Sequence, residues 1–223
     1  MRDNQPKHRQ ARRQQRKLER RRASRQGMSA ILIICEGQET EPNYIEGLCE
    51  SHRVNRAAVD LRRGDRATDP VSLVRKARQI FERDPTFDRV FVVCDGDGNV
   101  DDARKLAAQR LRSKDRSPLT VELIVSRPSI EFWLLLHFEY SSRPYRSAAE
   151  AIEALRGHLP IYDKSDRRIF EAVAPGLQQA IANTSRLTRE LRAAGSASPD
   201  SDFAVLAEVL LAQVPRVTHG RVA

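Results

Sequence analysis

Two short stretches decide the fold of this chain: AILIICEG at residues 30–37 and RVFVVCDGDG at residues 89–98. Each contains an uninterrupted apolar run rich in β-branched residues, which is typical of a strand covered on both faces. Each run ends in an acidic residue followed by glycine. We therefore predict two buried strands with carboxylates at their carboxyl ends.

The segments around these strands alternate between strand and helix patterns. A third buried strand is expected at residues 119–125 and a short one near residues 57–61, whereas apolar residues recur at helical spacing elsewhere. The expected helices lie at about 42–52, 69–81, 100–111, 129–138, 147–157, 166–193 and 202–213. This order predicts an α/β fold: a mostly parallel sheet flanked by helices, followed by a helical C-terminal part.

We divide the chain into a basic arm (1–27), an α/β core (28–145) and a helical C-terminal extension packed on the core (146–223). The arm contains eleven Lys or Arg and two acidic residues, so its net charge of +9 equals that of the whole chain and the rest sums to zero. With almost no apolar residues, the arm is expected to be disordered.

Basic arms of this kind often bind DNA or RNA through phosphate contacts. The candidate nucleic-acid-binding residues in the arm are Arg12, Arg13, Arg16, Lys17, Arg20, Arg21 and Arg22. The alternative is a solvated tail or a non-specific electrostatic anchor.

The sequence favours a cytoplasmic protein without a membrane partner. No apolar run approaches the ~20 residues that a bilayer requires, and the N-terminal stretch lacks a secretory pattern. The three cysteines have no paired spacing, and Cys35 and Cys94 lie inside the two strand patterns. We interpret these two as small buried hydrophobic residues in a reducing compartment.

The acids that end the two strands predict a metal site. Ligands of open α/β sheets bind at the carboxyl ends of the strands, and neighbouring strands lie ~4.8 Å apart. If the strands are neighbours, Glu36 and Asp95 come within reach of one ion, with Asp97 beside them. Carboxylate oxygens suit Mg²⁺ or Mn²⁺.

Each acid also has a structural alternative. Residues 95–99 (DGDGN) contain the residue types that dominate turns, and Glu36 stands close to the start of a helix, where acids are favourable. The same stretch resembles the start of an EF-hand loop, but Val100 and Leu106 occupy the positions that require Gly and Glu. Taken together, acids ending two buried strands favour a site.

Several motifs in order resemble the RloB family. They are Glu36-Gly37, Thr40-Glu41-Pro42-Asn43-Tyr44, Asp95-x-Asp97, Ser126-x-Pro128, Glu131-x-Trp133-Leu134-Leu135-Leu136-His137-Phe138, Tyr162-x-Lys164 and Pro199-x-Ser201. The resemblance implies a Toprim-like fold and a role in bacterial defence against phage, often beside an ATPase partner of the RloA type. It also implies that Glu36, Asp95 and Asp97 bind a divalent ion.

Other polar residues are candidates for supporting roles. Glu131, on the helix after the third strand, is a candidate fourth carboxylate or general base; the alternative is a partner of the helix dipole. Arg127 and Lys164 are candidates for neutralising a phosphate, although such surface residues are usually less specific. His137 is more often a core residue than a catalytic one.

Three functions follow from these residues. The first is a Mg²⁺-dependent nuclease for DNA or RNA, with Glu36 or Glu131 as general base. The second is a non-catalytic interaction or sensor subunit that binds nucleic acid or an ATPase. The third is a phosphatase, because Asp-x-Asp after a strand also occurs in aspartyl-phosphate chemistry, but this does not explain Glu36.

Overall fold

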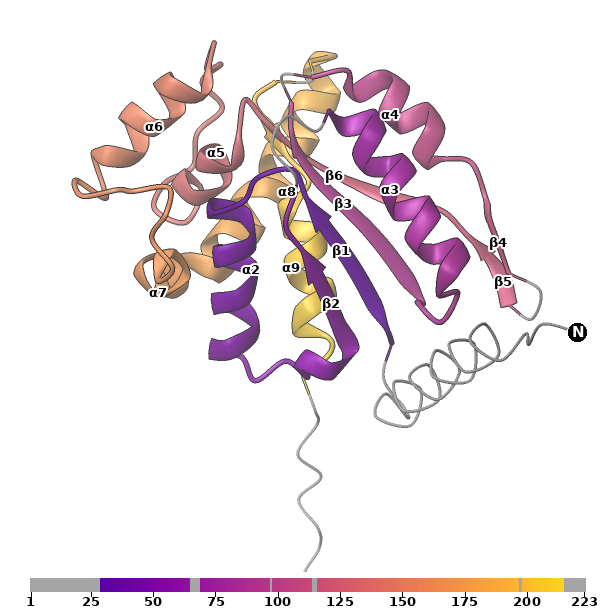
Figure 1. The fold of residues 1–223 in the computed structure, drawn as a ribbon. Coiled ribbons are helices and arrows are strands. Elements are labelled where there is room, and N and C mark those ends of the chain that lie inside the picture. Colours follow the sequence, from indigo (N-terminus) through magenta and orange to yellow (C-terminus); the bar gives the residue numbers. More distant parts are fainter. Residues whose placement is uncertain (1–28, 65–68, 97, 114–115, 197, 215–223) are drawn as a thin grey trace, which may run out of the picture.

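The computed structural model describes residues 29–64, 69–96, 98–113, 116–196 and 198–214. Its centre is a five-stranded sheet (Figure 1). In spatial order the strands are β2 (Val59–Arg62), β1 (Ile31–Cys35), β3 (Arg89–Asp95), β6 (Val121–Arg127) and β7 (Asp200–Ser201). The first four are parallel and β7 is antiparallel to β6. The predicted mostly parallel α/β sheet is confirmed.

Helices cover both faces of this sheet (Figure 1). They are α2 (Thr40–Ser51), α3 (Pro70–Arg83), α4 (Val100–Ala107), α5 (Ile130–Leu135), α6 (Ala148–Arg156), α7 (Ile169–Val173), α8 (Leu177–Ala194) and α9 (Phe203–Leu211), with short 3-10 turns η1 (Arg56–Ala58) and η2 (Ala174–Gly176). Within the described ranges, no helix is long and apolar enough to cross a membrane.

The alternation of side chains along β1 and β3 produces two separate cores. Leu32 and Ile34 pack with α3 and α4, while Ile31, Ile33 and Cys35 pack with α2, α5 and the helices of the C-terminal part. Both strands are therefore buried on both faces, which explains why their sequences are continuously apolar.

Three features of the fold differ from the sequence-based expectation. The segment expected as one helix at 166–193 is divided into α7, η2 and α8 around Pro175, because proline removes a backbone donor and clashes with the preceding turn. The hairpin β4 (Leu111–Ser113) and β5 (Arg116–Leu119) and the edge strand β7 were not expected. All three strands are short, and their polar sequences carry little strand signal.

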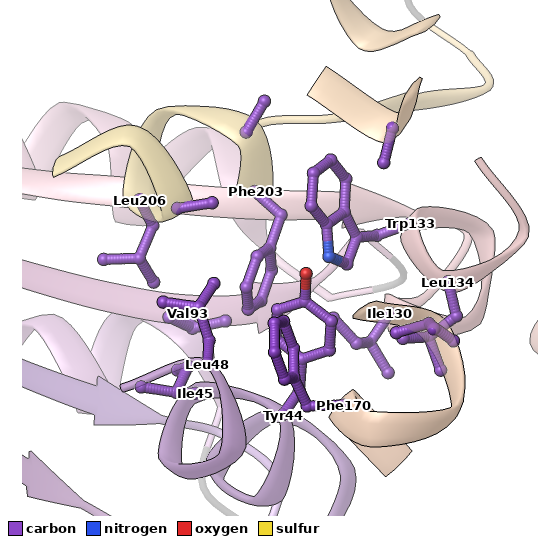
Figure 2. Close-up of a cluster of buried hydrophobic side chains, with 14 of the residues drawn as sticks. Tyr44, Ile45, Leu48, Val93, Ile130, Trp133, Leu134, Phe170, Phe203 and Leu206 are labelled. Carbon is purple, nitrogen blue, oxygen red and sulfur yellow. The ribbon is translucent and has the colours of Figure 1, made fainter. Parts of the chain in front are cut away.

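A buried aromatic cluster joins α2, α5, α7 and α9 on one face of the sheet (Figure 2). Tyr44 makes edge contacts with Trp133, Phe170 and Phe203, at ring centroid distances of 6.2, 5.2 and 5.2 Å. His137 belongs to the same cluster, where its Nε2 lies 2.9 Å from the Tyr44 hydroxyl and its Nδ1 lies 3.0 Å from the Trp133 carbonyl oxygen. Burial lowers the pKa of His137 to about 4. His137 is thus a hydrogen-bonded core residue.

Replacing Tyr44 with phenylalanine should reduce the free energy of unfolding by about 1–3 kcal/mol, because it leaves a buried nitrogen of His137 without its partner. Urea unfolding measures the effect. Tyr140→Phe is the control, since its hydroxyl bonds Glu190 at the surface and the loss should stay within about 0.5 kcal/mol. Equal losses in the two variants would contradict the prediction.

Candidate functional site

Glu36 and Asp95 lie side by side because β1 and β3 are adjacent and parallel. Cys35 pairs with Val93 in the register of the two strands, and the Glu36 amide donates to the Val93 carbonyl oxygen at 2.8 Å. The Glu36 carboxylate (Oε2) in turn accepts a hydrogen bond from the Asp95 amide at 3.1 Å. The structure therefore brings together two of the three predicted ligands, whereas Asp97 lies outside the described residues.

Asp95 also reaches the start of α5. Its Oδ1 accepts a hydrogen bond from the Ile130 amide at 3.1 Å, and this amide belongs to the first residue of the helix. The next residue, Glu131, is 0% exposed. The end of β3 is thus linked, through the hydrogen bond from the Ile130 amide to Asp95, to the residue that precedes the fully buried Glu131.

The buried carboxylate of Glu131 has three side-chain partners. Ser129 donates to Oε2 at 2.5 Å and Tyr162 donates to Oε1 at 2.9 Å. Lys164 completes the set, with its Nζ 3.2 Å from Oε1 and its side chain 54% exposed. A buried charge requires such partners to offset lost hydration. Lys164 is therefore paired with a carboxylate at the boundary between the protein interior and solvent.

The segment that carries Tyr162 and Lys164 is attached to the start of α2. Thr40 donates through its hydroxyl to the Lys164 carbonyl oxygen at 3.1 Å. The Asn43 side-chain amide lies 3.3 Å and 3.4 Å from the carbonyl oxygens of Ser165 and Asp166. Residues more than 120 positions apart in the chain thus form one wall beside the strand ends.

A cavity of about 440 Å³ opens between these elements. It is lined by Glu36, Gly37, Gln38, Glu39, Thr40, Glu41, Asp95, Ile130, Glu131 and Lys164. Glu41, in the first turn of α2, is only 6% exposed. Its carboxylate lies against Gly37, where a Cβ would come within 2.1 Å of Oε2. Gly37 therefore provides the space that this carboxylate occupies.

Among the residues that the structure describes, five carboxylate residues but a single lysine line the cavity. Burial, and after it the charges of Glu41, Glu131 and Glu36, raise the pKa of Asp95 to about 8, against the lowering effect of the Ile130 hydrogen bond. Burial is also the main cause that raises the pKa of Glu41, with Glu131 adding to it. Crowded buried carboxylates of this kind favour a proton or a cation.

The residue types suit a hard divalent cation, since four carboxylate residues, Glu36, Asp95, Glu41 and Glu131, line one cavity. Among the described residues, however, no three His, Cys, Asp or Glu side chains stand close enough to share one ion. Glu36 and Asp95 are the residues best placed to hold a metal, and Asp97 follows them in the chain.

Of the remaining candidates, only Arg127 belongs to the residues that the structure describes. Arg127 packs its side chain over Gly96 and ends β6 opposite Asp200, and it is absent from the described residues that line the cavity. The seven arginine and lysine candidates of the arm, from Arg12 to Arg22, lie outside the described residues.

The sequence interpretation did not assign Glu41 or Tyr162 to the site. In the sequence, Glu41 belongs to the Thr40–Tyr44 motif and stands five residues after Glu36, across a glycine. Tyr162 belongs to the Tyr162-x-Lys164 motif, but its link to Glu131 depends on how the C-terminal part packs.

Replacing Tyr162 with phenylalanine should lower the free energy of unfolding by about 1.5–3 kcal/mol, because a hydrogen bond to a buried charged carboxylate is lost. Chemical denaturation measures this loss. Tyr145→Phe is a matched control, since its hydroxyl bonds only Ser141 among the described residues and should cost about 1 kcal/mol. A loss at Tyr162 no greater than at Tyr145 would show that Glu131 does not depend on this tyrosine.

The fold and the site define a class: an α/β protein with a buried acidic cavity at the carboxyl edge of a mostly parallel sheet. The model of the RloB-like protein family matches residues 31–210. The chain therefore belongs to the RloB-like protein family, as the sequence motifs indicated. Neither the curated proteins nor the solved structures contain a significant match.

Proposed function

We propose that this protein is a metal-dependent nuclease of the Toprim type that hydrolyses phosphodiester bonds of DNA or RNA. The observation that carries the proposal is the cluster of carboxylate residues around one cavity, where burial and then the charges of Glu41, Glu131 and Glu36 raise the pKa of Asp95 to about 8. A divalent cation would offset this charge, and a phosphodiester could approach the same cavity only with such an offset.

Glu36, Asp95 and Asp97 would hold Mg²⁺ or Mn²⁺. When bound, such an ion polarises a phosphoryl oxygen and lowers the pKa of a water molecule. Glu131 or Glu36 would accept the proton of the attacking water. Lys164, whose ammonium group reaches the cavity at its exposed end, would steady the negative charge that develops on the phosphate.

The wider role that we propose is part of a bacterial anti-phage system. The protein would act in the cytoplasm with an ATPase partner of the RloA type, and the basic arm would add non-specific affinity for nucleic acid. Support for this role comes from the family alone.

The second candidate is a non-catalytic interaction or sensor subunit. Two observations favour it: Glu131 is occupied by Ser129, Tyr162 and Lys164, and the described residues hold no ready three-ligand group. In this case the acidic cluster would bind a structural ion or none, and the protein would act by binding nucleic acid or an ATPase.

A cleavage assay separates the two candidates. The full chain is incubated with single- and double-stranded DNA and RNA in Mg²⁺, in Mn²⁺ and in EDTA, with and without an ATPase encoded beside it. Nuclease function predicts cleavage that EDTA stops and that the double substitution Asp95→Ala, Asp97→Ala abolishes. Cleavage that survives this double substitution would end the nuclease proposal, and tight ATPase binding without any cleavage would favour the second candidate.

A further inference from the structure

Residues 28–223 have no net charge, yet their charges are unevenly distributed. Residues 70–83 and 100–112, which comprise α3, α4 and the chain into β4, contain eight Lys or Arg and three Asp or Glu, a net charge of +5. The acidic cavity lies between α2 and α5, which pack on the other face of the sheet. The zero net charge is therefore the sum of a basic face and an acidic cavity.

The two helices that carry most of these basic residues, α3 and α4, pack side by side (Figure 1). The Arg78 guanidinium, on α3, donates to the carbonyl oxygens of Leu106 and Gln109 at 3.5 and 2.8 Å. This contact holds the end of α4 against α3, and Arg110 is the residue that follows Gln109. Arg112 follows in the first strand of the hairpin.

Several of these cations lack counter-ions. Arg104 pairs with Asp202 and Lys105 with Asp102. By contrast, the exposed side chains of Arg75, Arg110 and Arg112 form no ion pair with any residue that the structure describes. Exposed arginines without carboxylate partners are available to an external anion, and arginine's planar fork matches a phosphate group.

The basic face begins at the edge of the sheet that carries the cavity. Both α3 and α4 begin at the edge of the sheet where β1 and β3 end, since Gly98, before α4, lies against Pro70 at the start of α3. The 14 residues of α3 span about 21 Å, which corresponds to about six base pairs of duplex. A nucleic acid whose scissile phosphate enters the cavity would extend naturally along this face.

We propose that Arg75, Arg110 and Arg112 bind the phosphate backbone of a nucleic-acid duplex on the side of the sheet opposite α2. This inference rests on the proposed function, because it places the flanking backbone of that substrate. It assigns affinity to the folded part of the protein in addition to the basic arm. Sequence preference is not expected from this face, because phosphate contacts position a duplex without identifying its bases.

Duplex binding in EDTA tests the proposal without any cleavage. The probes are fluorescently labelled DNA and RNA duplexes of identical sequence, about 20 base pairs long. Comparing the two probes shows whether the face binds DNA, RNA or both. The full chain is compared with the triple variant Arg75→Gln, Arg110→Gln, Arg112→Gln. The control variant Arg156→Gln, Arg167→Gln, Arg192→Gln removes the same charge from exposed positions of the C-terminal part.

The expected result is a reduced salt dependence of binding in the first variant alone. The slope of log K against log salt should fall by about 0.9 for each lost phosphate contact, so by about 2.7 in total. At 0.1 M salt, the affinity should fall by about five- to tenfold per arginine. The control variant should retain the slope of the unmodified chain.

Three results would overturn the proposal: no binding of either duplex by the full chain, equal slopes in the first variant and the unmodified chain, or an equal loss in both variants. Circular dichroism of both variants verifies folding, and these positions are exposed. Because binding is measured without metal, a failed nuclease assay leaves this test intact, and a failed binding test leaves cleavage chemistry open to its own assay.

Discussion

Asp95→Asn is expected to abolish Mg²⁺-dependent cleavage while leaving the protein folded. Asparagine has nearly the same shape and can still accept the hydrogen bond from the Ile130 amide, so the contact between β3 and α5 persists. It is, however, a neutral and weaker ligand for a hard cation. Because losing only an outer partner of a metal ligand costs about 10- to 100-fold, losing the ligand itself should lower kcat more than about 100-fold.

The same substitution should change how the metal affects stability. In the unmodified chain, a saturating divalent ion should raise the melting temperature, since a ligand at about 100 times its Kd contributes about 2.7 kcal/mol. In Asp95→Asn this increase should disappear. Calorimetry with Mg²⁺ or Mn²⁺ alone measures it, independently of any substrate.

Glu153→Gln is the matched control for both measurements. It removes a carboxylate from an exposed position of α6, away from the cavity, so that cleavage and the response to metal should stay within about twofold of the unmodified chain. Full cleavage by Asp95→Asn, or an unchanged response of its melting temperature to metal, would show that Asp95 is not a ligand.

The parts of this site that could be predicted are those fixed by strand pairing. Glu36 and Asp95 each end a continuous apolar run, and once the strands are parallel neighbours the two acids must meet at one edge. Because the apolar runs and the acids that end them are both visible in the sequence, the pairing of Glu36 with Asp95 could be predicted.

The rest of the site depends on contacts that no local pattern encodes. Tyr162 and Lys164 reach Glu131 because their segment is held by Thr40 and Asn43, more than 120 residues earlier in the chain. Similarly, β7 has only two residues, and its place beside β6 is set by the packing of α8 and α9. Long-range packing of this kind decides which candidate residues share a cavity, whereas periodicity decides only which residues form strands and helices.

The second large effect that we expect is a change of the free energy of unfolding with pH, caused mainly by Asp95. In EDTA, the free energy of unfolding should fall as the pH rises from about 4 to about 8. The pKa of Asp95 is about 8 in the folded protein, against 3.8 for an ordinary aspartate, chiefly because of burial and then because of Glu41, Glu131 and Glu36. Between these values the folded state holds a proton that the unfolded state has released.

The sign and size follow from this difference in bound protons. A raised pKa stabilises the folded state fully below the unfolded value, and the contribution is lost as the pH rises through the folded value. One proton corresponds to a slope of up to about 1.4 kcal/mol per pH unit. Glu41, whose pKa is also raised, mainly by burial, acts in the same direction.

Urea unfolding in EDTA at about pH 6, 7 and 8 measures this slope, in the window where ordinary carboxylates are already ionised. The pH profile of Asp95→Asn should have a smaller slope there, since of these two carboxyl groups only Glu41 remains to contribute. Mg²⁺ should reduce the slope of the unmodified chain by favouring the ionised carboxylate. Parallel pH profiles for the two proteins would mean that Asp95 is ionised in the folded state at neutral pH. The repulsion that we infer to be offset by a cation would then be absent, and with it the physical reason for a metal in this cavity.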